Sequence, residues 1–282
     1  MGTRFEILLW GGSEHRLQAA AREALEEIER LHCQLSAFDP ASDIWDINER
    51  AAWEPVLVEP RLFALLERCL GLSTQTHGAF DVTIGGLMAA WGFRDALTAS
   101  SRQSDPSQGR VGSSMVVLDR DACTVRFAAQ GLSLDLGGVA KGYALEAAAA
   151  ILTECRIGGA LIHGGTSSVL GLGTDPSGQP WRVGIRRPGT TDRANIIAAA
   201  NLRDRALGVS AQHGRMAGAA GHIMDPRSGR PAEGISLAAV ACPSATEADA
   251  FSTALLVLGS SFADELRSMG HEAWLFEAAE QP

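Results

Sequence analysis

The stretch LSLDLGGVAKGYALEAAAAIL, residues 132–152, changes its pattern partway along. Its first five residues alternate between leucine and a polar residue, which predicts a β-strand. From Val139 onward it consists mostly of strong helix formers and contains no proline, which predicts an α-helix. The two glycines in between therefore mark a corner where a strand leads into a helix.

The first turn of this expected helix carries an unusual charge. A helix start exposes unpaired backbone N–H groups and a partial positive charge. Lys141 places a cation there, where the helix dipole disfavours it. An anion at the corner would explain the lysine, whereas an ordinary corner with a solvated lysine needs no ligand. The stretch alone leaves both interpretations open.

The spacing of apolar residues along the chain predicts an α+β fold with mixed or antiparallel sheets and packed helices. Helices are expected at about 14–35, 60–76, 247–258 and 261–269. Short apolar runs between turn residues predict strands at 3–10, 160–165, 168–173, 181–186, 196–202, 237–242 and 272–278, and a hairpin over 115–128.

Three segments rich in turn-forming residues lie between these elements. Residues 35–50 are expected to form a loop, and the turn at 176–178 is expected to join its flanking strands as a hairpin. The stretch 98–112 lacks periodicity, so it is the expected surface loop or subdomain boundary. With 282 residues, 46% of them hydrophobic, the chain is predicted to form one globular domain over 1–282.

Composition argues against several classes of function. The net charge is −9 and the 24 basic residues are scattered, whereas a nucleic-acid surface needs clustered lysine and arginine. The five cysteines are far apart and odd in number, which argues against a zinc site or a disulfide framework. No stretch approaches the roughly 20 apolar residues of a membrane span. The N-terminus, MGTRFEILLWGG, lacks a basic region and a cleavage site, so the chain as given is predicted to be cytoplasmic.

Residues 246–259, TEADAFSTALLVLG, contain two oxygen-bearing side chains at helical spacing. Asp249 and Thr253 are four residues apart, so they share one helix face near its positive end. Together they are suited to ligate a hard cation. Alternatively, Thr246 and Asp249 form a capping box with aspartate in place of glutamate, although this does not account for Thr253.

A further candidate stands at the start of the turn-rich segment HIMDPRSGRP, residues 222–231. His222 is suited to act as a base, because histidine exchanges a proton near neutral pH. An isolated histidine is more commonly structural, so this residue by itself does not decide the function.

Seven stretches spread over nearly the whole chain occur in the order in which a known family has them. They are MGT (1–3), LSAFDPASDIWDIN (35–48), HGAFDVTIGGLMAAWGF (77–93), DLGGVAKGYALE (135–146), HGG (163–165), HIMDPRSGRP (222–231) and ADAFSTALLVLG (248–259). In these stretches the chain resembles the ApbE family, flavin transferases that move FMN from FAD to a threonine of a target protein and release AMP. The resemblance implies an ApbE-like architecture, related to the T-fold, with FAD and an acceptor protein as partners.

The resemblance also implies roles for individual positions. The corner before Lys141 would face the FAD pyrophosphate and a Mg²⁺ ion. The family's Mg²⁺ ligands match Gly138, through its backbone carbonyl, and the side chains of Asp249 and Thr253. His222 matches the family's proposed catalytic base. The positions around FAD match Met1, Phe38, Ala79, Phe80, Asp81, Asp135, Lys141 and Ile223.

The resemblance also bears on the cellular compartment of the protein. Most members of the family are exported lipoproteins with a cysteine anchor ahead of the MGT motif. The alternative to a cytoplasmic protein is therefore a periplasmic lipoprotein with a further segment upstream of Met1.

Three places depart from the family pattern. GGT at 164–166 stands where many members have GGN or GGD, VSA at 209–211 replaces TSG, and GGL at 85–87 replaces GPL. Thr166 is shorter and uncharged, which would weaken a contact near the flavin or the acceptor. Two other functions therefore stay open: a flavin-binding or flavin-storage protein, and a metal-dependent FAD pyrophosphatase that uses water as the acceptor.

Overall fold

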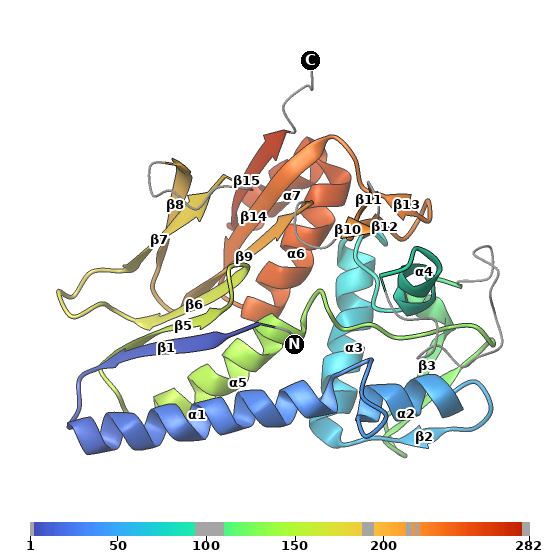
Figure 1. Ribbon diagram of the computed structural model, residues 1–282, viewed down its shortest axis with the longest axis horizontal. Coiled ribbons are helices and arrows are strands. Elements are labelled where there is room, and N and C mark those ends of the chain that lie inside the picture. The colour runs from blue at the N-terminus through green and yellow to red at the C-terminus, as the bar shows by residue number, and fades with distance from the viewer. Residues whose placement is uncertain (1–2, 94–109, 188–194, 213–215, 218–219, 278–282) are drawn as a thin grey trace. The chain divides into compact units, whose positions relative to one another are not determined.

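The computed structural model describes residues 3–93, 110–187, 195–212, 216–217 and 220–277. The chain forms two compact units, each assembled from segments that are distant in the sequence. Figure 1 labels most of the helices and strands of both units. Unit 1 comprises Met1–His32, Val139–His213 and Glu233–Pro282, and unit 2 comprises Cys33–Gly138 and Gly214–Ala232.

Unit 1 is built around a six-stranded antiparallel sheet with the order β1-β5-β6-β9-β14-β15. Its strands are β1 (Phe5–Trp10), β5 (Gly159–Gly164), β6 (Ser168–Gly173), β9 (Arg205–Ala211), β14 (Ile235–Cys242) and β15 (Glu272–Glu277). The unit also contains the two-stranded ribbon β7 (Trp181–Arg186) and β8 (Ile196–Leu202). Its helices are α1 (Glu14–Gln34), which ends just inside unit 2, α5 (Ala140–Glu154), α6 (Ala245–Leu258) and α7 (Ser260–Ser268).

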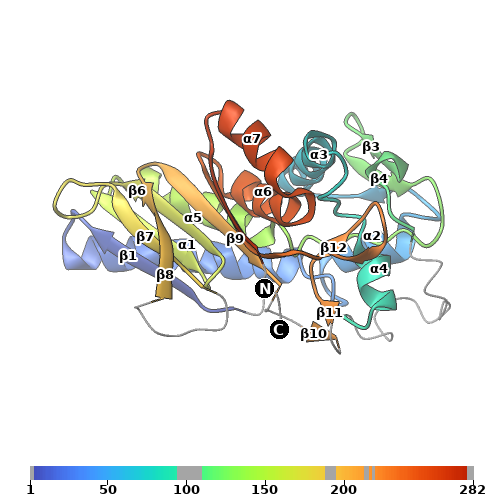
Figure 2. The same ribbon diagram turned by 90° about the horizontal axis from the view of Figure 1, so that it is seen from above.

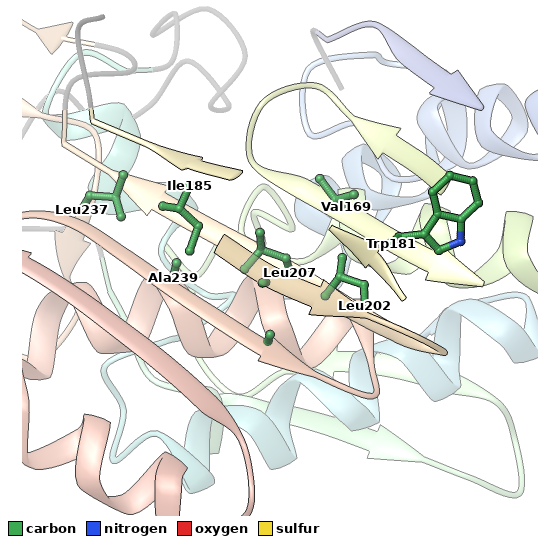
Figure 3. Packing of buried hydrophobic residues seen from close by; sticks show 9 residues of the cluster. Val169, Trp181, Ile185, Leu202, Leu207, Leu237 and Ala239 are labelled. Atoms are coloured by element: carbon green, nitrogen blue, oxygen red, sulfur yellow. The ribbon is translucent and has the colours of Figure 1, made fainter. Parts of the chain in front are cut away.

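Both faces of this sheet are covered. Helices α5 and α6 pack on one face and the β7–β8 ribbon lies over the other (Figures 1 and 2). Successive side chains of a strand point to opposite faces, so Leu237 and Ala239 of β14 enter an apolar cluster with Trp181 and Ile185 of the ribbon (Figure 3). Burial on both faces explains why residues 237–242 of β14 form a continuous apolar run.

Unit 2 combines short helices with small sheets. Its helices are α2 (Asp43–Arg50), α3 (Pro60–Gln75), α4 (Gly85–Ala90) and the 3-10 helix η2 (Ser113–Met115). A three-stranded sheet has the order β2 (Val56–Leu57), β4 (Thr124–Phe127), β3 (Val116–Asp119). Two short hairpins follow, β10 (Met216–Ala217) with β11 (Ala220–Gly221), and β12 (Met224–Asp225) with β13 (Arg230–Pro231).

The α+β class predicted from the sequence is confirmed, and local signals placed several boundaries well. Helix α3 begins at Pro60, after the N-cap Glu59, and ends at the C-cap Thr76, in agreement with the predicted range of 60–76. The hairpin expected at 115–128 is formed by β3 and β4.

Part of the expected loop at 35–50 is in fact helical, so that prediction was wrong. Ser42 caps α2 by accepting a hydrogen bond from the backbone N–H of Trp45 at 3.1 Å. Ile44 and Ile47, three residues apart, are buried on one face of this helix. The segment therefore carried a helix signal within its turn-forming residues.

Two strand predictions also need correction. The strands that flank the turn at 176–178 do not pair, because β6 pairs with β5 and β9 while β7 pairs with β8. The alternation at 132–136 is real, since Leu132, Leu134 and Leu136 are buried, but the segment makes only single bridges instead of a strand. Strand β9 was not predicted.

Most of the expected boundary at 98–112 lies outside the described residues, so it stays a prediction. In the part of the chain that the structure describes, no helix is both long and apolar enough to cross a membrane.

Candidate functional site

The corner before Lys141 is where helix α5 begins, and a carboxylate of α6 meets its amino end. The N-cap residue, Val139, has no side-chain oxygen and makes no capping bond. Instead the N–H of Gly142, at the third position of the helix, donates to Asp249 Oδ2 at 2.8 Å. An N-cap serine or aspartate normally accepts from this position. The chain itself therefore supplies a carboxyl group at the corner.

Asp249 is held by a second hydrogen bond in a buried position. The side chain of Ser168 on β6 donates from Oγ to Asp249 Oδ1 at 2.7 Å, and Asp249 is only 6% exposed. Burial raises the pKa of the Asp249 carboxyl, while the charge of Lys141 and the hydrogen bonds from Ser168 and Gly142 oppose this rise. A second positive charge at this carboxylate would favour its ionised form.

Thr253 lies one helical turn beyond Asp249 on α6, as the spacing predicted. Its Oγ1 donates to the backbone carbonyl of Asp249 at 3.0 Å and lies 3.2 Å from Ser210 Oγ of β9. Ser210 Oγ is also 2.9 Å from Ser252 Oγ. Ser210 belongs to the VSA segment that departs from the family pattern, and the serine of that segment contacts the hydroxyl of Thr253.

The alternative interpretation of Thr246 and Asp249 as a capping box was wrong. The N-cap of α6 is Ser244, whose Oγ accepts from the N–H of Glu247 at 3.0 Å. Thr246 lies inside the helix, and the carboxylate of Asp249 is directed to α5 instead of to its own helix.

Two glycines allow α6 to approach its neighbours this closely. A Cβ on Gly142 would lie 2.1 Å from the carbonyl oxygen of Ala245, and a Cβ on Gly208 of β9 would lie 2.2 Å from that of Ala248. Both distances are far below van der Waals contact. Helix α6 is therefore held against the backbone of α5 on one side and that of β9 on the other.

The oxygen atoms of the Asp249 and Thr253 side chains on α6 are suited to ligate a hard divalent cation. A carboxylate and a hydroxyl are oxygen ligands of the kind that Mg²⁺ prefers, and the raised pKa of Asp249 marks a carboxyl that a cation would stabilise in its charged form. Gly138, the third expected ligand, is the last residue of its segment in unit 2. The described residues contain no group of three or more His, Cys, Asp or Glu that could hold a metal. The expected set contains a single carboxylate and does not require such a group.

Unit 2 places two of the predicted FAD residues on neighbouring segments. The N–H of Asp135 donates to the carbonyl of Val82 at 2.7 Å, and Ser133 bridges Ile84 in parallel. The segment that contains Asp135 therefore runs beside the segment that follows Asp81. Asp135 Oδ1 accepts from the N–H of Gly137 at 2.8 Å, which shapes the glycine turn before α5.

The carboxylate of Asp81 is engaged within its own unit. It is 7% exposed and accepts from the N–H and Oγ1 of Thr83 at 2.8 and 2.6 Å, from the N–H of Ser113 at 3.0 Å and from Ser73 Oγ at 3.3 Å. Ala79 and Phe80 are also buried, at 1% and 4% exposure. These three side chains stabilise the loop at 79–81, so a ligand would mainly contact the backbone of this loop.

The remaining predicted residues of unit 2 are more accessible. Phe38 is 45% exposed, and His222 and Ile223 are partly buried in the segment that leads into the β12–β13 hairpin. The carbonyl of Ile223 accepts from the N–H of Ala232 at 2.9 Å, which closes that hairpin. Met1 lies outside the described residues.

Asp225, in the same hairpin, is tied to an arginine. Its two carboxylate oxygens accept from Nε and Nη2 of Arg227 at 2.9 and 3.0 Å. Burial raises the pKa of Asp225, but the hydrogen bonds and charge of Arg227 outweigh it and bring the pKa below its usual value. A carboxylate held in its ionised form by an arginine is a weak proton acceptor.

Several contributors to the site were not predicted from the sequence. Ser168, Gly142 and Ser210 all contact Asp249 or Thr253 directly. Their sequence distances from those residues range from 43 to 107 positions, so no local pattern connects them. Lys141, Asp249 and Thr253 belong to unit 1, whereas the other predicted residues within the described ranges belong to unit 2.

Comparison with known proteins gives consistent matches along the chain. The model of the ApbE family matches residues 1–275. An FAD:protein FMN transferase of Rhodobacter capsulatus is 32% identical over 268 residues, which are 92% of this chain and 50% of that protein. An FAD:protein FMN transferase of Treponema pallidum is 31% identical over 86% of this chain and 72% of that protein. This chain thus spans about half the length of the first relative.

A solved structure is similar over nearly its whole length. The crystal structure of the ApbE protein of Thermotoga maritima superposes with a TM-score of 0.83 at 25% identity, covering 97% of this chain and 94% of that one.

Proposed function

Because this chain belongs to the ApbE family, we propose that it is an FAD:protein FMN transferase. It moves FMN from FAD to a threonine hydroxyl of an acceptor protein and releases AMP. The observation that carries the proposal is the match of the family to residues 1–275. The relatives named FAD:protein FMN transferase, at 32% and 31% identity, support the same activity.

The proposed reaction exchanges the phosphoanhydride bond of FAD for a phosphoester bond to threonine. The threonine oxygen attacks the phosphorus on the FMN side of the pyrophosphate, and the bond from that phosphorus to the bridging oxygen breaks. The bonding electrons leave with AMP, and the proton of the hydroxyl passes to a base. Catalysis of such a step consists mainly of positioning and of offsetting negative charge.

Residues of unit 1 are suited to the pyrophosphate. Lys141 carries a positive charge at the amino end of α5, where it would offset the charge on the departing AMP phosphate. Asp249, Thr253 and the carbonyl of Gly138 would hold Mg²⁺. When bound, this ion polarises the phosphoryl oxygens and orients the transferred group.

Residues of unit 2 are suited to the flavin nucleotide and to proton transfer. The exposed ring of Phe38 would stack on the adenine, and the segments at 79–81, Asp135 and Ile223 would contact other parts of FAD. We assign His222 as the base that accepts the threonine proton. The ion pair of Asp225 with Arg227 supports this choice over Asp225.

A second candidate function uses the same site with water as the acceptor. Thr166 is exposed in the turn between β5 and β6, where many family members have asparagine or aspartate. If the asparagine or aspartate at that position contacts the acceptor in the family, threonine would weaken this contact. The enzyme would then be an FAD pyrophosphatase that produces FMN and AMP.

Incubation with FAD and Mg²⁺, with and without a threonine-containing acceptor peptide, tests the proposal. A transferase releases AMP only when the peptide is present and increases the peptide mass by one FMN. The same peptide with valine in place of its threonine is the matched control. AMP and free FMN without peptide would indicate the pyrophosphatase, and bound FAD without any AMP would indicate a storage protein.

A further inference from the structure

Helix α5 also supplies a carboxylate to the amino end of α6. Glu146, four residues after Gly142, accepts from Ser244 Oγ at 2.5 Å and from the N–H of Thr246 at 3.0 Å, both at Oε1. Its Oε2 accepts from Thr246 Oγ1 at 2.8 Å. Ser244 is the N-cap of α6, and Thr246 is fully buried. Three donors at this helix end therefore converge on one side chain of another helix.

The two helices thus cap each other. Asp249 of α6 accepts from the third N–H of α5, and Glu146 of α5 accepts from the second N–H of α6. Each carboxylate lies at the positive end of the other helix, where hydrogen bonding and the dipole both favour it. We call these two contacts the reciprocal caps.

The Glu146 contact is not needed merely to cap α6. Ser244 already takes the N–H of Glu247, so the helix has an ordinary N-cap within its own sequence. What the additional bonds achieve is to fix α6 relative to α5. The backbone of Gly142 approaches the carbonyl of Ala245 at the same helix crossing. A small slide of α6 along α5 would therefore disrupt this backbone contact and the Glu146 hydrogen bonds together.

This crossing lies directly beside the proposed phosphate and metal residues. Asp249 and Thr253 are on α6, and Lys141 is on the first turn of α5. A shift of α6 would move the carboxylate away from the N–H of Gly142 and change its distance from the charge of Lys141. The Glu146 contact therefore lies where it controls the position of the Asp249 carboxylate relative to Gly142 and Lys141.

We propose that Glu146 is a positioning residue, which holds the amino end of α6 so that the Asp249 carboxylate stays on the amino end of α5. The effects of Glu146 on Mg²⁺ binding and on kinetics rest on the function proposed above. Its effect on the position of the Asp249 carboxylate is independent of that function. Residues that orient metal ligands typically change metal affinity or activity by about 10- to 100-fold when they are replaced.

The first test measures positioning without any ligand. In Glu146→Ala, we expect exchange of the Gly142 amide hydrogen to become about tenfold faster, because the Asp249 bond that protects it is lost more often. Glu154→Gln, an exposed carboxylate at the end of the same helix, is the matched control and should leave exchange unchanged. Unchanged Gly142 protection in Glu146→Ala would overturn the proposal.

The second test separates positioning from simple stability. In Glu146→Ala, kcat for FMN transfer should fall about tenfold while KM for FAD stays within about twofold, and excess Mg²⁺ should restore part of the loss. Glu146→Gln keeps one acceptor oxygen and should be intermediate. A lower melting temperature with unchanged kcat in the folded protein would mean that Glu146 only stabilises the fold.

A milder variant keeps the test decisive if Glu146→Ala does not fold. Thr246→Val removes one hydroxyl donor to Glu146 and preserves the shape of the buried side chain. It should accelerate Gly142 exchange less than Glu146→Ala, in the same direction. If the parent protein transfers no FMN but these variants still change Gly142 exchange, the proposed function fails and the positioning role stands.

Discussion

At the residue scale, Asp249 combines a structural role with the proposed chemical one. Its carboxylate completes the amino end of α5 and is buried at a cost that the charge of Lys141 and two hydrogen bonds offset in part. Asparagine would satisfy the same two neighbours, because its oxygen accepts from Gly142 and the hydroxyl of Ser168 is able to rotate and accept. Beyond the dipole of α5 and the charge of Lys141, a bound cation would favour a carboxylate over asparagine at this position.

Replacing Asp249 by asparagine tests this explanation. Burial raises the folded pKa above the unfolded value of 3.8, so the folded state binds the proton more tightly. The parent therefore loses stability as the pH rises from 3.8 through the folded pKa, and the Asn variant does not. Without metal at neutral pH, we expect the variant to melt at or above the parent, whereas Mg²⁺ should raise the melting temperature of the parent only.

Thermal melts across this pH range, with and without Mg²⁺, make the comparison. Equal stabilisation of Asp249→Asn and the parent by Mg²⁺ would contradict the ligand assignment. Asp225→Asn serves as a carboxylate control outside unit 1.

Replacing His222 by alanine should separate chemistry from binding. A base acts only in the transition state, so turnover should fall about 10²- to 10⁴-fold while FAD affinity is retained. Residual transfer should recover partly at high pH, as hydroxide replaces the missing base. Single-turnover transfer measured across pH, beside an FAD titration, tests this. A fall in turnover that only matches a fall in FAD affinity would make His222 a binding residue.

At the element scale, the position of α6 depends on two backbone contacts that tolerate no side chain. The methyl group of Gly142→Ala would meet the carbonyl of Ala245, and both elements are held by further hydrogen bonds. We expect the free energy of unfolding of this variant to fall by about 1–3 kcal/mol.

The matched control is Gly71→Ala, in the exposed middle of α3 with no atom near the added methyl group. Alanine forms a helix more readily than glycine, so this variant should gain up to about 1 kcal/mol. Urea unfolding of both variants measures the contrast. A similar change in the free energy of unfolding of the two variants would show that α5 and α6 are able to separate without cost.

At the scale of the whole molecule, stability should decline in mild acid. Burial lowers the pKa of His163, against the charge of Glu6, and also lowers the pKa of His271. Their unfolded value is 6.5, so the neutral histidines stabilise the fold fully above that pH and lose this contribution as the pH falls towards their folded pKa.

Melting temperatures between about pH 7.5 and 5.5 check this dependence. The double variant His163→Gln, His271→Gln should flatten the slope, although the lost packing of His271 on Phe251 lowers the absolute value. His15→Gln, at an exposed position of α1, is the control for the replacement of a histidine by glutamine. An unaltered slope in the double variant would show that other groups control the acid response.

The sequence predicted what depends on neighbours along the chain. The range predicted for α3, 60–76, agrees with its start at Pro60 and its C-cap at Thr76. The shared face of Asp249 and Thr253 follows from their spacing of four. The family followed from seven ordered motifs, and the α+β class followed from apolar periodicity. Helix α2 was missed although its signal is local, because the turn formers around Ser42 hid the burial of Ile44 and Ile47.

Only the tertiary structure decided which distant groups meet. The local turn at Asp175 formed as expected, since its N–H donates to the carbonyl of Gln179, yet the strands beside it joined different sheets. Likewise, local spacing left open that Thr246 and Asp249 cap their own helix, but the carboxylate of Asp249 accepts from the N–H of Gly142, 107 residues away. Capping and turn preferences act over a few residues and can be read in the sequence. The partner of a buried carboxylate depends on which helices the sheet brings into contact, and burial of the whole core sets that arrangement.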